Sequence, residues 1–429
     1  MLNDSSSTRL RFIQNMARAT LGLSASFIPA YAKEKNHIPH LAKAHAGSAK
    51  HVIYLYMSGG MSHIDTFDMR PENKTIQGPV APIRTSADGI RISEYLPYTA
   101  KQMHHVSIIN SMRSTQGVHE KGNYFMHTSY TARGTISHPS LGTWINHFCP
   151  AINSTLPQSV VVGGDHTINL NPGFFEAKNA PMPMVTPSSG ILAVKGNPNI
   201  SQSRKKARLE KLQKMNATFM KQNDMKKIKS YDDIYREALK VMSSRDLLAF
   251  DINKENPTLR QQYGSTPFGD ACMLARRLVE YDTRFIEIDL GGWDSHFENH
   301  DEVEENCATL DKGLAALLGD LHSRGLLDET LVVLATEFGR TSKINSRKGR
   351  DHQPAAFTTL LAGGGVKGGN IYGKKNNDCD DVIENEVSIP DFNATIGYAL
   401  GLPQEEIIIS PSGRPFTFAD KGNPISDLF

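Results

Sequence analysis

The sequence has 429 residues, of which 39% are hydrophobic and 21% charged, a composition that excludes collagen-like and intrinsically disordered chains. Lys and Arg number 47 and Asp and Glu 45, so the formal net charge of +2 gives no reason to expect nucleic acid or an anionic membrane as the main partner. No stretch reaches the roughly 18 consecutive apolar residues of a membrane span, so no transmembrane segment is predicted.

Residues 1–32 are predicted to be an export leader. Three arginines lie in or beside a mildly apolar stretch that ends in Ala30-Tyr31-Ala32, the small-x-small pattern of a cleavage site. The segment is similar to a twin-arginine export signal, with Leu10 in the place of the second arginine. Cleavage leaves residues 33–429 as a single exported domain. The alternative is an amphipathic helix that stays attached.

Short runs of β-branched residues recur along the chain and predict fully buried strands. Between two of them, from Cys307 to Leu321, apolar residues recur at spacings of three and four, which predicts a crossover helix. This alternation predicts a three-layer α/β/α fold with a mostly parallel, doubly wound sheet, whose ligands bind at the carboxyl ends of the strands. The predicted strands are residues 52–57, 106–111, 160–163, 284–290, 331–336 and 357–362.

A basic segment interrupts this alternation. Residues 204–229 hold ten Lys or Arg and two acidic residues, with an apolar stripe from Leu209 to Phe219. Because a charge run is usually a solvated helix face, we expect a helical insertion at residues 200–250 that lies on the core. A basic docking face for a polyanion or another exported protein is the alternative.

The four cysteines are widely spaced and form no CxxC pair, which excludes zinc-finger and thioredoxin-type motifs. In an oxidising compartment one or two disulfides can form, and isolated buried thiols are equally compatible with the spacing.

Polar residues follow the first two predicted strands. Gly59-Gly60 allows a sharp turn or a close approach of the backbone to a ligand, and Ser62 and Asp65 come just after it, as candidates for binding an anion and a metal. A serine-hydrolase triad within this loop is disfavoured because adjacent side chains point apart. His119 follows the strand at residues 106–111 at a predicted helix start and is expected to reach the same sheet edge, although a packed or solvated histidine is the alternative.

The strongest single signal follows the strand at residues 284–290. Asp294, His296 and His300 lie within seven residues and supply oxygen and nitrogen donors of the kind that bind zinc, manganese or iron. The alternative is a loop whose Asp caps the next helix and whose histidines face water.

The next strand, at residues 331–336, is followed by a second polar group. Glu337, Asp351 and His352 are candidate metal ligands, and Arg340 and Arg350 are candidate anion-binding residues because guanidinium groups match phosphate and sulfate. An ion pair between Arg340 and Glu337 is the structural alternative.

Ordered motifs carry a resemblance to a known family. They are MSGGMSHIDTFD, GVHEKGNYFMHTSY, HPSLGTW, FGDACMLARRLVE, GGWDSHFENH and ATEFGRTSKINSRKGRDHQP. With the leader, they make the chain resemble the domain-of-unknown-function family 1501 of exported bacterial proteins, from about His51 to Phe416. That family is similar to the sulfatase and alkaline phosphatase superfamily, whose members bind one or two divalent metals and hydrolyse phosphate or sulfate esters. The resemblance implies an alkaline phosphatase-like fold in a periplasmic or secreted bacterial protein.

The resemblance also implies roles for single residues. The superfamily's nucleophile corresponds to residues 118–120, where no hydroxyl or thiol exists and His119 is the candidate. An expected Asp-His pair is replaced by Glu337-Phe338, so one of two metal clusters is incomplete, whereas the last expected histidine matches His352. One divalent ion of zinc, manganese, iron or calcium is therefore predicted, held by Asp294, His296 or His300, and His352.

These expectations combine into two functions. The first is an exported metal-dependent hydrolase of sulfate or phosphate esters that acts on a small anionic or a sulfated or phosphorylated glycan substrate, with His119 and Arg340 as catalytic candidates and water activated by the ion as nucleophile. The second is a non-catalytic exported binding or assembly protein that keeps the pocket of the same fold and has lost the nucleophile.

Overall fold

The computed structural model describes residues 47–163, 169–184, 186–187 and 244–429, together with positions 203, 204, 207, 211, 240 and 241. The predicted export leader at residues 1–32 and most of the basic segment of the predicted insertion lie outside the described residues. None of the described helices combines the length and the hydropathy that a membrane-spanning segment requires.

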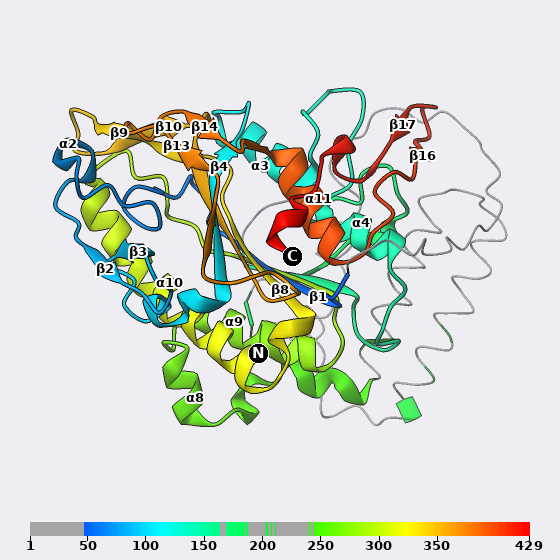
Figure 1. The fold of residues 1–429 in the computed structure, drawn as a ribbon. Helices are drawn as coiled ribbons and strands as arrows, with labels where there is room; N and C mark the ends of the chain where they lie inside the picture. The colour runs from blue at the N-terminus through cyan, green and yellow to red at the C-terminus, as the bar shows by residue number, and fades with distance from the viewer. Residues whose placement is uncertain are drawn as a thin grey trace, which may run out of the picture.

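In the described residues, nine strands form one sheet and further strands form two-stranded pairs (Figure 1). The sheet contains β1 (His51–Tyr56), β4 (Val106–Arg113), β5 (Ser159–Val162), β6 (Met182–Met184), β7 (Phe285–Asp289), β8 (Thr330–Ala335), β11 (Phe357–Ala362), β12 (Asn370–Tyr372) and β15 (Val387–Ser388). The pairs are β2 (Pro82–Arg84) with β3 (Arg91–Ser93), β9 (Gly339–Ile344) with β10 (Arg350–Gln353), β13 (Lys374–Lys375) with β14 (Val382–Glu384), and β16 (Ile408–Ile409) with β17 (Pro415–Phe416). The α-helices are α2 (Lys74–Gln77), α3 (His119–Thr128), α4 (Leu141–Phe148), α8 (Pro257–Gln262), α9 (Pro267–Glu280), α10 (Asn299–Ser323) and α11 (Ile389–Ala399).

The sheet is mostly parallel, as predicted. Its strand order is β12-β4-β11-β8-β1-β7-β5-β6, with β15 also paired to β4. Central β1 pairs in parallel with β7 on one side and β8 on the other, so α10 crosses over β1 between them. The exception is β11, which runs antiparallel to both β4 and β8. All six strands predicted from the sequence belong to this sheet.

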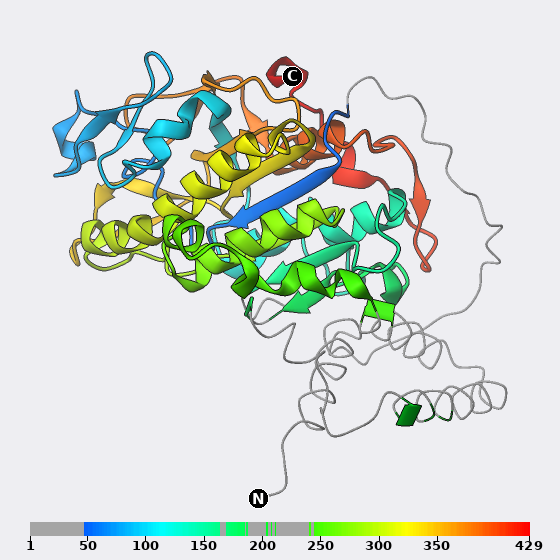
Figure 2. The same ribbon diagram turned by 90° about the horizontal axis from the view of Figure 1, so that it is seen from below.

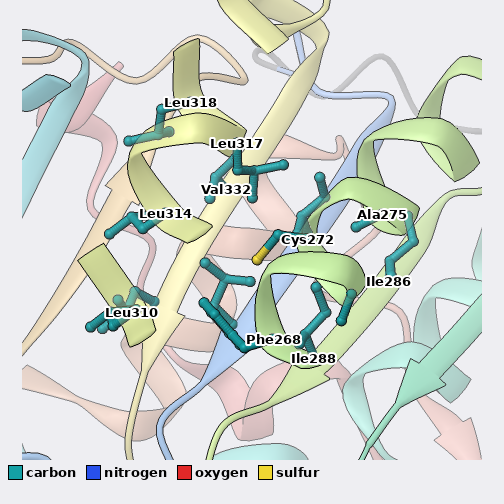
Figure 3. Close-up of a cluster of buried hydrophobic side chains, with 14 of the residues drawn as sticks. Phe268, Cys272, Ala275, Ile286, Ile288, Leu310, Leu314, Leu317, Leu318 and Val332 are labelled. Carbon is teal, nitrogen blue, oxygen red and sulfur yellow. The ribbon is translucent and has the colours of Figure 1, made fainter. Parts of the chain in front are cut away.

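Two helix layers cover the sheet, which confirms the three-layer fold. Alternate residues of β1 face opposite sides, with Ile53 and Leu55 in one core cluster and Tyr54 and Tyr56 in the other. The first cluster packs under α9 and α10, which lie on either side of β1 in Figure 2. The second packs under α3, α4 and α11. Figure 3 shows the first cluster, in which Leu310, Leu314, Leu317 and Leu318 of α10 meet Phe268 and Cys272 of α9 over the sheet.

The parallel strands deliver their following loops to one edge of the sheet. The strands β1, β7 and β8 run the same way, and β4, which is antiparallel to β11, shares their direction. Their carboxyl ends therefore meet at the edge where the start of α3 and the β9–β10 pair also lie (top of Figure 1).

Candidate metal centre

Two glycines bring the loops after β1, β7 and β8 into contact. Gly59 has a φ of +117° and Gly60 a φ of +79°, which L side chains rarely adopt. A Cβ on Gly59 would lie 2.6 Å from the backbone nitrogen of Asp294, and one on Gly60 would lie 2.7 Å from the Phe338 ring. Glycine at both positions therefore allows these loops to pack against one another.

Three imidazoles and one carboxylate converge at this edge. The Nε2 atoms of His119, His296 and His352 lie 3.2, 3.3 and 3.3 Å from Oδ1 of Asp294. His296 Nε2 and His352 Nε2 are 3.0 Å apart. The ligand atoms of His119, Asp294 and His352 all lie within 4.8 Å of one another, a spacing that could hold a metal ion, and His296 lies beside Asp294 and His352. These four side chains are called the histidine–aspartate cluster.

Each imidazole of the cluster is held from behind through Nδ1. His119 Nδ1 lies 2.7 Å from the Glu337 carboxylate, and His296 Nδ1 lies 3.0 Å from the Asp351 carboxylate. His352 Nδ1 lies 2.8 Å from the carbonyl oxygen of Gly117. Glu337 and Asp351, which the sequence offered as ligands, are therefore placed behind the histidines, as the carboxylate partners that orient metal-binding imidazoles.

These Nδ1 partners assign the protons of the three rings. Carboxylates and carbonyls accept hydrogen bonds, so each Nδ1 carries the hydrogen and each neutral ring presents an unprotonated Nε2. His119 Nε2 is buried without a hydrogen-bond partner among the described residues. The unprotonated Nε2 atoms of His296 and His352 and the Asp294 Oδ1 atom lie 3.0–3.3 Å apart, so a proton or a metal cation is needed between them to offset their repulsion. The donor set therefore fits a divalent metal ion.

Arg340 orients the carboxylate of Asp294. Its guanidinium is fully buried, donates to Asp294 Oδ1, and is itself held by the carbonyl oxygens of Gly59, Gly60 and Arg350. Burial raises the pKa of Asp294, but the hydrogen bond and charge of Arg340 outweigh it and bring the pKa to about 2. Asp294 is thus a permanently ionised ligand, and Arg340 is a positioning residue that has little capacity left for an external anion.

The pKa values of two cluster histidines are shifted in opposite directions. The hydrogen bond that His119 donates to Glu337 raises the pKa of His119 above its ordinary value, against the effect of burial. Burial lowers the pKa of His352. Both rings must be neutral to bind a metal, so His119 is the ring whose protonation competes first as the pH falls.

The remaining predicted residues form a separate group. The buried carboxylate of Asp65 receives two hydrogen bonds from Arg350, at 2.8 and 3.0 Å, and one from Ser62. The other N–H groups of Arg350 donate to carbonyl oxygens, including that of Ile76. His300 Nδ1 lies 3.6 Å from Asp65. Arg350 and Ser62 are therefore structural partners of Asp65 and have no free donor for an anion, and His300 is the histidine that does not join the cluster.

A second group with metal-ligand chemistry lies elsewhere. The donor atoms of His63, Asp68 and Cys379 lie within 4.8 Å of one another, and all three residues are buried. However, Asp68 already pairs with Arg70 at 2.6 Å and with Lys375 at 2.9 Å. Two cations already offset the charge of this carboxylate, so a metal ion is electrostatically less favoured here than in the histidine–aspartate cluster.

Two groups that hold the cluster histidines in place could not be predicted from the sequence. The carbonyl of Gly117 has no sequence signal, because any residue supplies a carbonyl. Phe338 stands where the resemblance implied a histidine, and its ring centroid lies 5.0 Å from that of His119 and 4.5 Å from that of His352. It fixes two imidazoles by packing rather than by ligation.

Solved structures similar to this chain are distant. An alkaline phosphatase superfamily protein from Vibrio parahaemolyticus has 9% identity and a TM-score of 0.42, covering 99% of this chain and 78% of that one. The PsFucS1 sulfatase from Pseudoalteromonas sp. has 10% identity and a TM-score of 0.41, covering 99% and 75%. The alkaline phosphatase from the Antarctic bacterium TAB5 has 14% identity and a TM-score of 0.34, covering 77% and 95%.

Among curated proteins, none matches the sequence. The family model described as "Protein of unknown function (DUF1501)" matches residues 49–429, which is most of the chain. The resemblance expected from the ordered motifs is thereby confirmed, and the chain belongs to the DUF1501 family.

Proposed function

We propose that the protein binds one divalent metal ion in the histidine–aspartate cluster and uses it to hydrolyse a sulfate or phosphate ester. The observation that carries this proposal is the convergence of three Nε2 atoms on Asp294 Oδ1, with each ring held through Nδ1. Three imidazole nitrogens and one oxygen favour zinc or iron over calcium, which takes oxygen ligands.

The protein residues divide the work around that ion. A divalent metal supplies Lewis acidity toward an ester oxygen and toward water. His119, His296, His352 and Asp294 would hold it, and Arg340 keeps Asp294 ionised and oriented. Asp294 has a side-chain exposure of 49%, so the cluster is open to solvent on one side and a substrate can approach it.

Turnover of p-nitrophenyl sulfate and p-nitrophenyl phosphate by the metal-loaded protein tests this function. We expect hydrolysis of at least one ester, its loss with a chelator, and its loss in His352→Ala. His322→Ala, which changes an exposed histidine at the end of α10, serves as the matched control and should keep the activity. Activity that survives in His352→Ala would contradict the proposal.

A non-catalytic binding protein on the same fold is the second candidate. In the described part of the chain, no hydrogen-bond partner of the four cluster side chains is a hydroxyl or a thiol. This supports a site that lacks a protein nucleophile of the superfamily type. Metal binding and anion binding without turnover, over a broad panel of esters, would favour this candidate.

Export belongs to the same proposal. We infer a periplasmic or secreted location from the leader predicted at residues 1–32. Amino-terminal sequencing of the protein recovered from a periplasmic extract should begin at or near Lys33. A mature protein that begins at Met1 and stays in the cytoplasm would contradict it.

A further inference from the structure

An exposed aromatic ring lies next to one of the cluster histidines. Phe297 follows His296 directly and is 52% exposed, although a large apolar ring is normally buried. The guanidinium carbon of Arg347 lies 4.2 Å from the centroid of the Phe297 ring. The pair offers one apolar surface and one positive charge on the same rim.

The backbone around this pair is locked. Phe297 forms a bridge with Lys348, and the Asn345 side chain donates to the His296 carbonyl at 3.2 Å. Asn345 also accepts from the backbone nitrogens of Arg347 and Gly349, each at 2.9 Å. A Cβ on Gly349 would lie 2.0 Å from the His296 carbonyl, so the two segments approach as closely as glycine permits. The same contacts that place His296 in the cluster therefore hold Phe297 and Arg347, and little conformational freedom remains to be lost on binding.

Arg347 is one of the cations in the described part of the chain that form no ion pair. The side chains of Arg340 and Arg350 are buried and hydrogen bonded, and Lys348 pairs with Glu298 at 3.1 Å. Among the described residues, the exposed Arg347 side chain has no hydrogen-bond partner. Asn345, which accepts from the Arg347 backbone nitrogen, donates to the Asp351 carboxylate that holds His296, so Arg347 follows directly on the contacts behind the cluster.

We propose that Phe297 and Arg347 form a substrate-recognition platform for a sugar ring that carries its own tetrahedral oxyanion, sulfate or phosphate. Phe297 stacks against the apolar face of the ring, and Arg347 pairs with the oxyanion. The inference rests on the proposed function, because the neighbouring ester of the same glycan faces the histidine–aspartate cluster. It predicts a preference for oligosaccharides with several anionic groups over singly substituted esters.

Fluorescence anisotropy with labelled sulfated, phosphorylated and neutral oligosaccharides of equal length tests the platform. The parent should bind the sulfated or the phosphorylated oligosaccharide at least tenfold more tightly than the neutral one. Whichever of these two anionic oligosaccharides binds more tightly identifies the oxyanion. Phe297→Ala and Arg347→Gln should each weaken that binding about tenfold. Tyr98→Ala and Lys101→Gln are the matched controls, because they alter a second exposed aromatic–cation pair of the described residues, with 5.4 Å between Lys101 Nζ and the centroid of the Tyr98 ring. These two variants should bind the anionic oligosaccharide with an affinity within twofold of the parent.

Metal content, measured on every variant, separates this inference from the proposed function. Anionic glycan binding that needs Phe297 and Arg347 in a protein that takes up no metal supports the platform and overturns the hydrolase. Metal uptake and ester turnover with equal affinity for all three oligosaccharides, or with unchanged affinity in both platform variants, overturns the platform alone.

Discussion

Replacing Glu337 by Gln tests how much the carboxylate behind His119 contributes to metal affinity, and leaves the four cluster side chains unchanged. Glu337 is 2% exposed and accepts from His119 Nδ1 at 2.7 Å, from the Tyr56 hydroxyl at 3.0 Å and from the Gly59 nitrogen at 3.0 Å. Gln keeps the size and an acceptor oxygen but loses the charge that makes the imidazole a better ligand. Carboxylates in this position are typically worth 10–100-fold in metal affinity, or about 1.4–2.7 kcal/mol.

Competition with a chromophoric zinc chelator at pH 7.5 measures this loss. NMR titration of His119 should show its pKa falling in Glu337→Gln, because the hydrogen bond with Glu337 is the main cause that raises it. Tyr56→Phe, which removes a neighbouring donor and leaves the contact with His119, is the control and should have a clearly smaller effect. A zinc affinity of Glu337→Gln within twofold of the parent, with the pKa shift present, would refute the role of His119 as a ligand.

Three further predictions concern the rest of the molecule. Asp65→Asn leaves the guanidinium of Arg350 buried without its counter-charge and should lower the free energy of unfolding in urea by about 3 kcal/mol, whereas a loss below about 1 kcal/mol would show that the pair is not buried as described. Burial lowers the pKa of His138 to about 4, so between pH 6.5 and 4 the unfolded chain binds a proton that the folded protein does not. The free energy of unfolding should therefore decrease by on the order of 3 kcal/mol as the pH is lowered through that window. In paired urea titrations, His138→Gln should lack this decrease. All four cysteines are buried free thiols, so a thiol reagent should count four in the unreduced denatured protein and none in the native one, and a denatured count of two would reveal a disulfide.

The layers of the fold could be predicted because the pattern of each strand and helix is local. Runs buried on both faces are apolar throughout, and this identified all six predicted strands, from β1 to β11. The direction of β11 could not be predicted, because an apolar run reads the same in a parallel and an antiparallel sheet. The antiparallel β9–β10 pair connects β8 to β11 at one edge of the sheet, so β11 starts at the edge where β8 ends and runs in the opposite direction.

The chemistry of the site could be predicted better than its geometry. Asp294 and His352 were expected together with either His296 or His300, and they lie together with His296. Asp65 and Arg350 were expected at the same edge, but they satisfy each other in a buried pair, and a sequence does not show which charges find internal partners. Because a loop has no fixed period, the choice between His296 and His300 also required the structure.

Metal content of the dialysed protein, measured by elemental mass spectrometry after incubation with zinc, tests the histidine–aspartate cluster most directly. The account predicts one equivalent of zinc in the parent and less than a tenth in His352→Ala and in Asp294→Ala. His63→Ala, which alters the other group of metal-ligand residues, should keep the full equivalent. A parent without bound metal, or a zinc equivalent that is lost in His63→Ala and kept in His352→Ala, would contradict the account.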